Sequence, residues 1–154
     1  MKFLTNVSKI FRKSIDTNII AVTGSCGKTT LKELLGNVLS KISKVSISPR
    51  SYNNKFGVPL SLINLKQNDE YGILEVGMDK KGEIDYLSKI IEPNVGVITN
   101  INYAHAKNFK NIKQIALAKS EIINNIRPNG FVVLNADDSF FKIHYNIAKK
   151  KILK

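Results

Sequence analysis

The feature that most constrains this chain is one glycine-containing run, Thr23-Gly24-Ser25-Cys26-Gly27-Lys28-Thr29-Thr30. Apolar residues 19–22 precede it and predict a short buried strand, and apolar residues at three- and four-residue steps over 31–39 predict a helix after it. A strand, a glycine-containing turn with Lys-Thr, and a helix are together typical of a P-loop. In such a loop, glycines let backbone N–H groups approach phosphate oxygens, and the helix N-terminus adds unpaired donors.

We therefore expect residues 23–30 to form a nucleotide site, with Lys28 at the β- and γ-phosphates and the Thr29 hydroxyl on Mg²⁺. The run departs from the common motif because Val22 stands where the first glycine is usual. The alternative is a plain strand-turn-helix with a surface lysine, and the flanking strand and helix favour the P-loop. We interpret Cys26 as a small loop residue, because a nucleophilic cysteine needs a base partner and the sequence offers none nearby.

Composition adds few constraints. A chain of 154 residues suits one domain with a hydrophobic core. The net charge of +12 could indicate nucleic-acid binding, yet nearly all the basic residues are lysine in a chain also rich in Ile and Asn, which is typical of codon composition. No basic stripe with interleaved aromatic residues is present, so we expect no nucleic-acid partner. The single cysteine, the absence of an apolar run near ~20 residues and the absence of a signal core predict a cytoplasmic protein without a membrane span.

The other segments alternate between helix and strand patterns. Residues 3–11 predict an amphipathic helix, for which packing on the domain is favoured over contact with a membrane. Further strands are expected at 45–47, 71–76, 95–99 and 131–134, with another opening at 152, and further helices at 58–65, 83–91, 112–125 and 140–147. This alternation predicts an α/β fold with a mainly parallel sheet and helices on both faces.

Four polar features follow predicted strands: the P-loop, Glu75, His105 and the run Asn135-Ala136-Asp137-Asp138. The carboxyl ends of parallel strands share one edge of the sheet, so these features should converge there on a Mg-nucleotide site. Glu75 and Thr29 offer the oxygen ligands that Mg²⁺ prefers. From the residues alone, His105 could equally be a metal ligand or a histidine that staples a loop. Lys119 is consistent with an ordinary solvated lysine, and the run at 135–138 with a helix cap.

Taken together, several stretches resemble the Mur ligase family in its central ATP-binding domain. They are Val22 to Thr30, Leu74-Glu75-Val76-Gly77, Thr99-Asn100-Ile101-Asn102-Tyr103-Ala104-His105, Ala118-Lys119-Ser120-Glu121-Ile122 and Leu134-Asn135-Ala136-Asp137-Asp138. The likeness covers nearly the whole chain and accounts for Val22, because the family's loop reads Thr-Gly-Ser/Thr-x-Gly-Lys-Thr. It implies a P-loop NTPase-like sheet, with ATP and Mg²⁺ as cofactors. The segment Ser51-Tyr52-Asn53-Asn54-Lys55-Phe56-Gly57-Val58-Pro59-Leu60 is most similar to the MurF branch.

The resemblance also implies a reaction. MurF-type ligases join D-alanyl-D-alanine to UDP-N-acetylmuramoyl-tripeptide in peptidoglycan precursor synthesis, through an acyl phosphate made from ATP. Positioning and charge neutralisation dominate such chemistry. By the likeness, Lys28 neutralises the β- and γ-phosphates, while Thr29 and Glu75 hold a Mg²⁺ that bridges them.

Three further roles are implied by the same resemblance. His105 matches a histidine that binds a second Mg²⁺. Lys119 matches a lysine that many members carry as a carbamate, an anion that helps to hold a metal. Asn53 and Asn54 match residues that contact the muramoyl-peptide substrate.

The resemblance also indicates which parts of the family's enzymes this chain covers. Residues 1–17 match a helix linking into the central domain, and residues 18–154 match that domain without its C-terminal end. We therefore expect that the family's N-terminal UDP-binding and C-terminal ligase domains are absent. On that expectation the chain is the ATP-binding piece of a ligase, whose partners include the missing domains. The alternatives are a free-standing ATP-binding module without ligase activity, another Mur-type ligase similar to folylpolyglutamate synthase, and a basic NTPase that associates with nucleic acid.

Overall fold

A computed structural model describes residues 2–103 and 108–152 of the chain. Its centre is a sheet in which every pairing is parallel, with the strand order β2-β3-β1-β4-β5. The strands are β1 Asn18–Thr23, β2 Val45–Ile47, β3 Tyr71–Glu75, β4 Val95–Ile98 and β5 Phe131–Leu134. The predicted α/β fold and parallel sheet are confirmed. In the register, Val22 of β1 lies between Glu75 of β3 and Val97 of β4, so the end of β1 lies between those of two neighbours.

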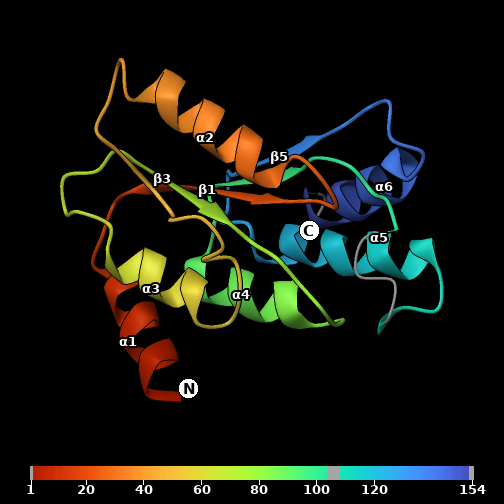
Figure 1. The fold of residues 1–154 in the computed structure, drawn as a ribbon, viewed down its shortest axis with the longest axis horizontal. Helices are drawn as coiled ribbons and strands as arrows, with labels where there is room; N and C mark the ends of the chain where they lie inside the picture. The colour runs from red at the N-terminus through yellow and green to blue at the C-terminus, as the bar shows by residue number, and fades with distance from the viewer. Residues whose placement is uncertain (1, 104–107, 153–154) are drawn as a thin grey trace.

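Helices lie on both sides of the sheet (Figure 1). They are α1 Lys2–Lys13, α2 Lys28–Leu39, α3 Gly57–Ile63, α4 Glu83–Ile91, α5 Ile112–Ser120, the 3-10 helix η2 Glu121–Asn125 and α6 Phe141–Ile152. α2 packs on one face, where its leucines cover Ile20, Val22, Ile73 and Val97. The larger core, which holds residues from α3, α4, α5, η2 and α6, occupies the other face. In the described part of the chain, no helix has the length and apolar character needed to cross a bilayer.

Two sequence predictions about helix ends are wrong. The helical pattern over 112–125 is not one α-helix, because it tightens into η2 where Glu121 and Asn125 reach across to α4. The strand expected to open at Ile152 is instead the last turn of α6. Lys151 fixes that turn, because its Nζ donates to the carbonyls of Asn124 at 2.8 Å and Ile126 at 2.6 Å.

Helix α1 packs against α3 and α4, and its apolar stripe contributes only in part: Phe11 packs against the core, while other members of the stripe are exposed. Phe3 and Ile10 are 82% and 70% exposed, whereas Thr5, Ser8 and Arg12 are buried. Arg12 Nε donates to the carbonyl of Ile91 at 2.6 Å, so the guanidinium caps the C-terminal end of α4. Burial lowers the pKa of Arg12 to about 10. Polar bonds, which periodicity does not reveal, therefore anchor this helix.

Candidate nucleotide and metal site

The predicted phosphate loop connects β1 to α2 in a conformation that needs glycine. Gly24 and Gly27 have φ angles of +146° and +78°. A Cβ on Gly24 would lie 1.8 Å from Thr99 Oγ1, so no larger residue fits unless the loop moves. Thr23, the last residue of β1, is buried, and Thr30 is exposed in the first turn of α2. The geometry is that of a strand-loop-helix turn with the helix N-terminus facing the loop.

The chain that follows β4 holds this loop. The Ser25 N–H donates to the carbonyl of Asn100 and the Cys26 N–H to Asn100 Oδ1, each at 2.9 Å. Thr99 Oγ1 donates to the Cys26 carbonyl at 2.7 Å, and the Asn102 N–H donates to Ser25 Oγ at 2.8 Å. Sequence reasoning gave Thr99, Asn100 and Asn102 no role of their own. Their position directly after the strand beside β1 is the signal that could have found them.

Two lysine amines meet at one carbonyl of the loop. Lys28 Nζ donates to the Gly24 carbonyl at 3.0 Å and to the Ser25 carbonyl at 3.2 Å, and Lys119 Nζ donates to the same Gly24 carbonyl at 2.8 Å. Lys119 is only 1% exposed, so the interpretation of a solvated lysine is wrong. Burial, followed by the positive charge of Lys28, lowers the pKa of Lys119 from 10.5 to about 7. The phosphate loop is therefore lined by one cation and by one amine that readily loses its proton.

Glu75 lies beside the loop at the end of β3. Its Oε2 accepts from Thr29 Oγ1 at 2.7 Å, its Oε1 accepts from Asn53 Nδ2 at 2.9 Å, and the residue is 3% exposed. A hydroxyl oxygen and a carboxylate side by side at a helix N-terminus form a donor set that suits Mg²⁺. Within residues 2–103 and 108–152, no three His, Cys, Asp or Glu side chains gather as a metal site. A cation held here would therefore depend on Thr29, Glu75 and ligand oxygens, while His105 lies outside the described residues.

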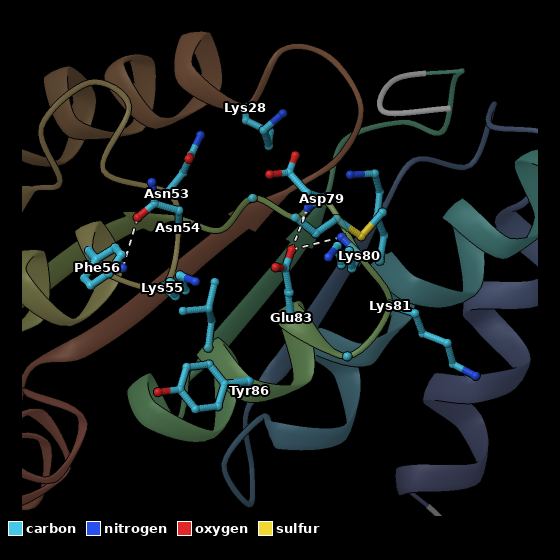
Figure 2. A pocket seen from close by; sticks show the side chains of 15 residues that line it. Lys28, Asn53, Asn54, Lys55, Phe56, Asp79, Lys80, Lys81, Glu83 and Tyr86 are labelled. Carbon is cyan, nitrogen blue, oxygen red and sulfur yellow. Dashed lines mark hydrogen bonds between the residues drawn. The ribbon is translucent and has the colours of Figure 1, made fainter. Parts of the chain in front are cut away.

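A cleft of about 940 Å³ opens from the phosphate loop. Figure 2 shows Lys28 at one end, and Phe56 and Tyr86 at the other. Asn53 and Asn54 both line it, and Asn54 Oδ1 also accepts from the backbone N–H groups of Phe56 and Gly57, which orders the start of α3. One cavity is therefore lined by Lys28, expected to contact the phosphates, and by the two asparagines expected to contact substrate.

The floor of the cleft is a loop, residues 77–82, that two glutamates brace. Glu83 Oε2 accepts from the N–H groups of Asp79 and Lys80 at 2.6 and 2.9 Å. Glu121 accepts from the N–H groups of Gly82 and Asp85 at the N-terminus of α4, a position that favours a carboxylate. Burial raises the pKa of Glu121, and the hydrogen bonds oppose that rise. Sequence reasoning missed both braces.

The run at 135–138 contributes to the loop after β4. Asp138 Oδ1 accepts from the Phe140 N–H at 2.8 Å, so its side chain orders the turn before α6 rather than capping an N–H group within the helix. Its Oδ2 accepts from the N–H of Ile101 at 2.7 Å. Asp138 therefore supports the segment that in turn holds the phosphate loop.

Comparison with known families matches residues 22–154 to the Mur ligase middle domain. The chain belongs to the Mur ligase family. A Buchnera aphidicola protein named UDP-N-acetylmuramoyl-tripeptide–D-alanyl-D-alanine ligase is 38% identical over 151 residues, covering 91% of this chain and 33% of the relative. The crystal structure of MurF from Acinetobacter baumannii superposes with a TM-score of 0.93 at 38% identity, over 96% of this chain and 33% of that one.

A second solved relative carries a nucleotide. MurF ligase from Thermotoga maritima in complex with ADP has a TM-score of 0.84 at 31% identity, covering 99% of this chain and 34% of that one. The chain thus spans about a third of the length of the relatives it matches. The relatives named here are MurF-type ligases, both among the sequences and among the solved structures.

Proposed function

We propose that this chain supplies the ATP-binding part of a ligase that joins D-alanyl-D-alanine to UDP-N-acetylmuramoyl-tripeptide in the cytoplasm. The observation that carries the proposal is the pairing of Thr29 with Glu75 at a phosphate loop that opens into the cleft of Asn53 and Asn54. The names of the matched relatives support the same substrates. The ADP in the Thermotoga relative supports a nucleotide at the loop.

In the proposed reaction, a carboxylate oxygen of the acid substrate bonds to the γ-phosphorus of ATP, and the bond to ADP breaks. The amine of the incoming dipeptide then attacks the acyl carbonyl and loses a proton, and inorganic phosphate leaves. Lys28 neutralises charge on the β- and γ-phosphates, and the backbone N–H groups of the loop orient them. Thr29 and Glu75 would hold Mg²⁺, which would offset the negative charge of the phosphates.

Lys119 has a separate proposed role. With a pKa of about 7, much of its amine is neutral at physiological pH. The neutral amine adds to CO₂: its nitrogen bonds to carbon, the electron pair of one C=O bond moves to oxygen, and the nitrogen loses one proton, which leaves an anionic carbamate. That anion would help to hold a cation beside the phosphates, and His105 is proposed as a further ligand.

Calorimetric titration with ATP and Mg²⁺ tests the nucleotide role. Lys28→Ala should weaken binding by more than about tenfold, because phosphate charge loses its counter-charge. Lys41→Ala is the matched control, since Lys41 is an exposed lysine that does not line the cleft. Equal affinity in the Lys28 and Lys41 variants would remove the P-loop role.

A chimera tests the ligase role. This chain would replace the matching third of Acinetobacter baumannii MurF, and phosphate release would be measured with UDP-N-acetylmuramoyl-tripeptide and ATP, with and without D-alanyl-D-alanine. Release that depends on the dipeptide and is lost in Lys28→Ala is the expected result. ATP binding without such release from a folded chimera would favour an ATP-binding module that forms no amide bond.

A further inference from the structure

Lys32 is a lysine with no exposed surface, one helical turn after the phosphate-loop residues Lys28 and Thr29. Its Nζ donates to the carbonyl of Ser48 at 2.6 Å and lies 3.3 Å from Glu33 Oε1, on a side chain that is 42% exposed. A buried ammonium is costly unless bonds compensate it. The short bond to the Ser48 carbonyl compensates this cost, so any role of Lys32 should act through Ser48.

That bond sits where β2 leaves the sheet. The Ser48 N–H donates to the carbonyl of Ile73 at 2.9 Å, as the next rung of the parallel ladder requires. In a regular ladder the Ser48 carbonyl would then accept from the N–H of Glu75. Here Lys32 takes the carbonyl, and the Glu75 N–H donates to Ser48 Oγ at 3.2 Å instead. A lysine and a hydroxyl have replaced the last rung.

The chain beyond the replaced rung brings one cleft residue, Asn53, onto Glu75. Beyond Ser48 the chain turns away from the sheet and brings Asn53 back onto Glu75 Oε1 at 2.9 Å. The other carboxylate oxygen accepts from Thr29 on α2. Lys32 ties the same helix to the end of β2, so α2, the turn after β2 and the end of β3 are joined around one carboxylate.

We propose that Lys32 is a positioning residue which, through Ser48, fixes the Glu75 carboxylate for a divalent cation. The inference rests on the proposed function, since it takes Thr29 and Glu75 as the cation's protein ligands. Lys32 touches neither nucleotide nor cation. Its effect should therefore appear in the part of nucleotide affinity that depends on the cation.

The test compares ATP affinity with saturating Mg²⁺ and with EDTA, by calorimetry on the full chain. Lys32→Met keeps an unbranched stem and removes the ammonium. We expect it to lower the strengthening of ATP binding by Mg²⁺ by about tenfold or more, as loss of a supporting partner does at metal sites. Affinity in EDTA should change by less than about twofold, because the phosphate loop retains its own bonds. Ser48→Ala removes the hydroxyl that accepts from the Glu75 N–H and should lower the strengthening by Mg²⁺ in the same way. This variant replaces Lys32→Met in the test if Lys32→Met fails to fold.

A double-mutant cycle separates positioning from general weakening. The quantity compared is the factor by which Mg²⁺ strengthens ATP binding. In a Glu75→Gln background, Lys32→Met should not change this factor further, because both substitutions act on one carboxylate. The inference would be overturned if Mg²⁺ strengthened ATP binding by the same factor in folded Lys32→Met as in wild type. Equal losses of ATP affinity with Mg²⁺ and with EDTA would also overturn it. Wild-type chain that binds ATP equally with and without Mg²⁺ would also overturn it. Wild-type chain that binds no ATP would overturn the proposed function itself.

Discussion

Replacing Lys119 with methionine should make the folded chain more stable near neutral pH. The folded state holds this amine with a pKa of about 7, against 10.5 for an exposed lysine, and its side chain is almost fully buried. At 1.36 kcal/mol for each pH unit between those values, keeping the lysine inside costs about 5 kcal/mol below pH 7. The lost bond to the Gly24 carbonyl offsets about 1 kcal/mol of the gain, since Lys28 still donates to that oxygen.

The sign of the pH dependence follows from the same two values. Between pH 7 and 10.5 the unfolded chain holds the Lys119 proton and the folded chain does not, so wild-type stability rises with pH. The cost is present in full below the folded pKa and vanishes above the unfolded one. The advantage of Lys119→Met should therefore shrink by about 3 kcal/mol between pH 7 and pH 9.5.

Urea denaturation at several pH values, in buffers freed of CO₂, measures this difference directly. Repeating it with bicarbonate should raise the stability of wild type and leave Lys119→Met unchanged if a carbamate forms. Lys89→Met is the matched control, because Lys89 is more than half exposed and its removal should give no comparable trend with pH. A constant difference between Lys119→Met and wild type from pH 7 to pH 9.5 would refute the reasoning, because it would mean that Lys119 titrates like a solvated lysine.

Three other predictions concern the supports of the site. Arg12→Met should lower the free energy of unfolding by about 3 kcal/mol in urea, because buried carbonyls including that of Ile91 lose their donor; a change within error would contradict this. Glu121→Ala should lower the melting temperature by an amount equivalent to about 1 kcal/mol, because the N–H groups of Gly82 and Asp85 lose their acceptor, and no shift would count against the brace. Burial lowers the pKa of His144, whose Nδ1 lies 2.7 Å from Ser120 Oγ, so the unfolded chain takes up the proton first and wild-type stability should fall as pH drops below 6.5. His144→Asn should make stability less dependent on pH in this range, and an equal dependence in the variant would exclude the histidine as its source.

The elements of the fold were predictable because their signals are local. Each strand is a short apolar run between turn-forming residues, and the alternation of strand and helix is enough to predict a parallel sheet. The position of Glu75 at the edge formed by the carboxyl ends of the strands was also predictable, because it follows from the parallel order of the strands. Where two local signals compete, prediction failed: the apolar pattern through Asn125 continues past the point at which Glu121 turns toward α4.

The supports of the candidate site were not predictable, because they depend on partners far apart in the sequence. Lys32 has the sequence signature of an exposed helical lysine, and only the departure of β2 at Ser48 gives its ammonium a buried acceptor. Arg12 lies opposite the apolar stripe of α1, so periodicity assigns it to solvent although it is buried against α4. In both cases a cation bonds to backbone carbonyls that the end of a helix or of a strand leaves free, and such carbonyls have no signature in the sequence.

Strand order explains which polar residues reach the phosphate loop. β1 lies between β3 and β4, so the loop that follows β1 is within reach of the ends of both. Glu75 after β3 therefore bonds to Thr29, and Asn100 after β4 bonds to Cys26, whereas Asp138 after β5 is one strand further away and bonds only as far as Ile101. Strands β2 and β3 lie on one side of β1, and β4 and β5 lie on the other. The end of β1 is therefore the point of reversal at which open α/β sheets bind ligands. The order of strands therefore places the end of β3, where Glu75 lies, beside the loop that follows β1, where the nucleotide and its cation are proposed to bind.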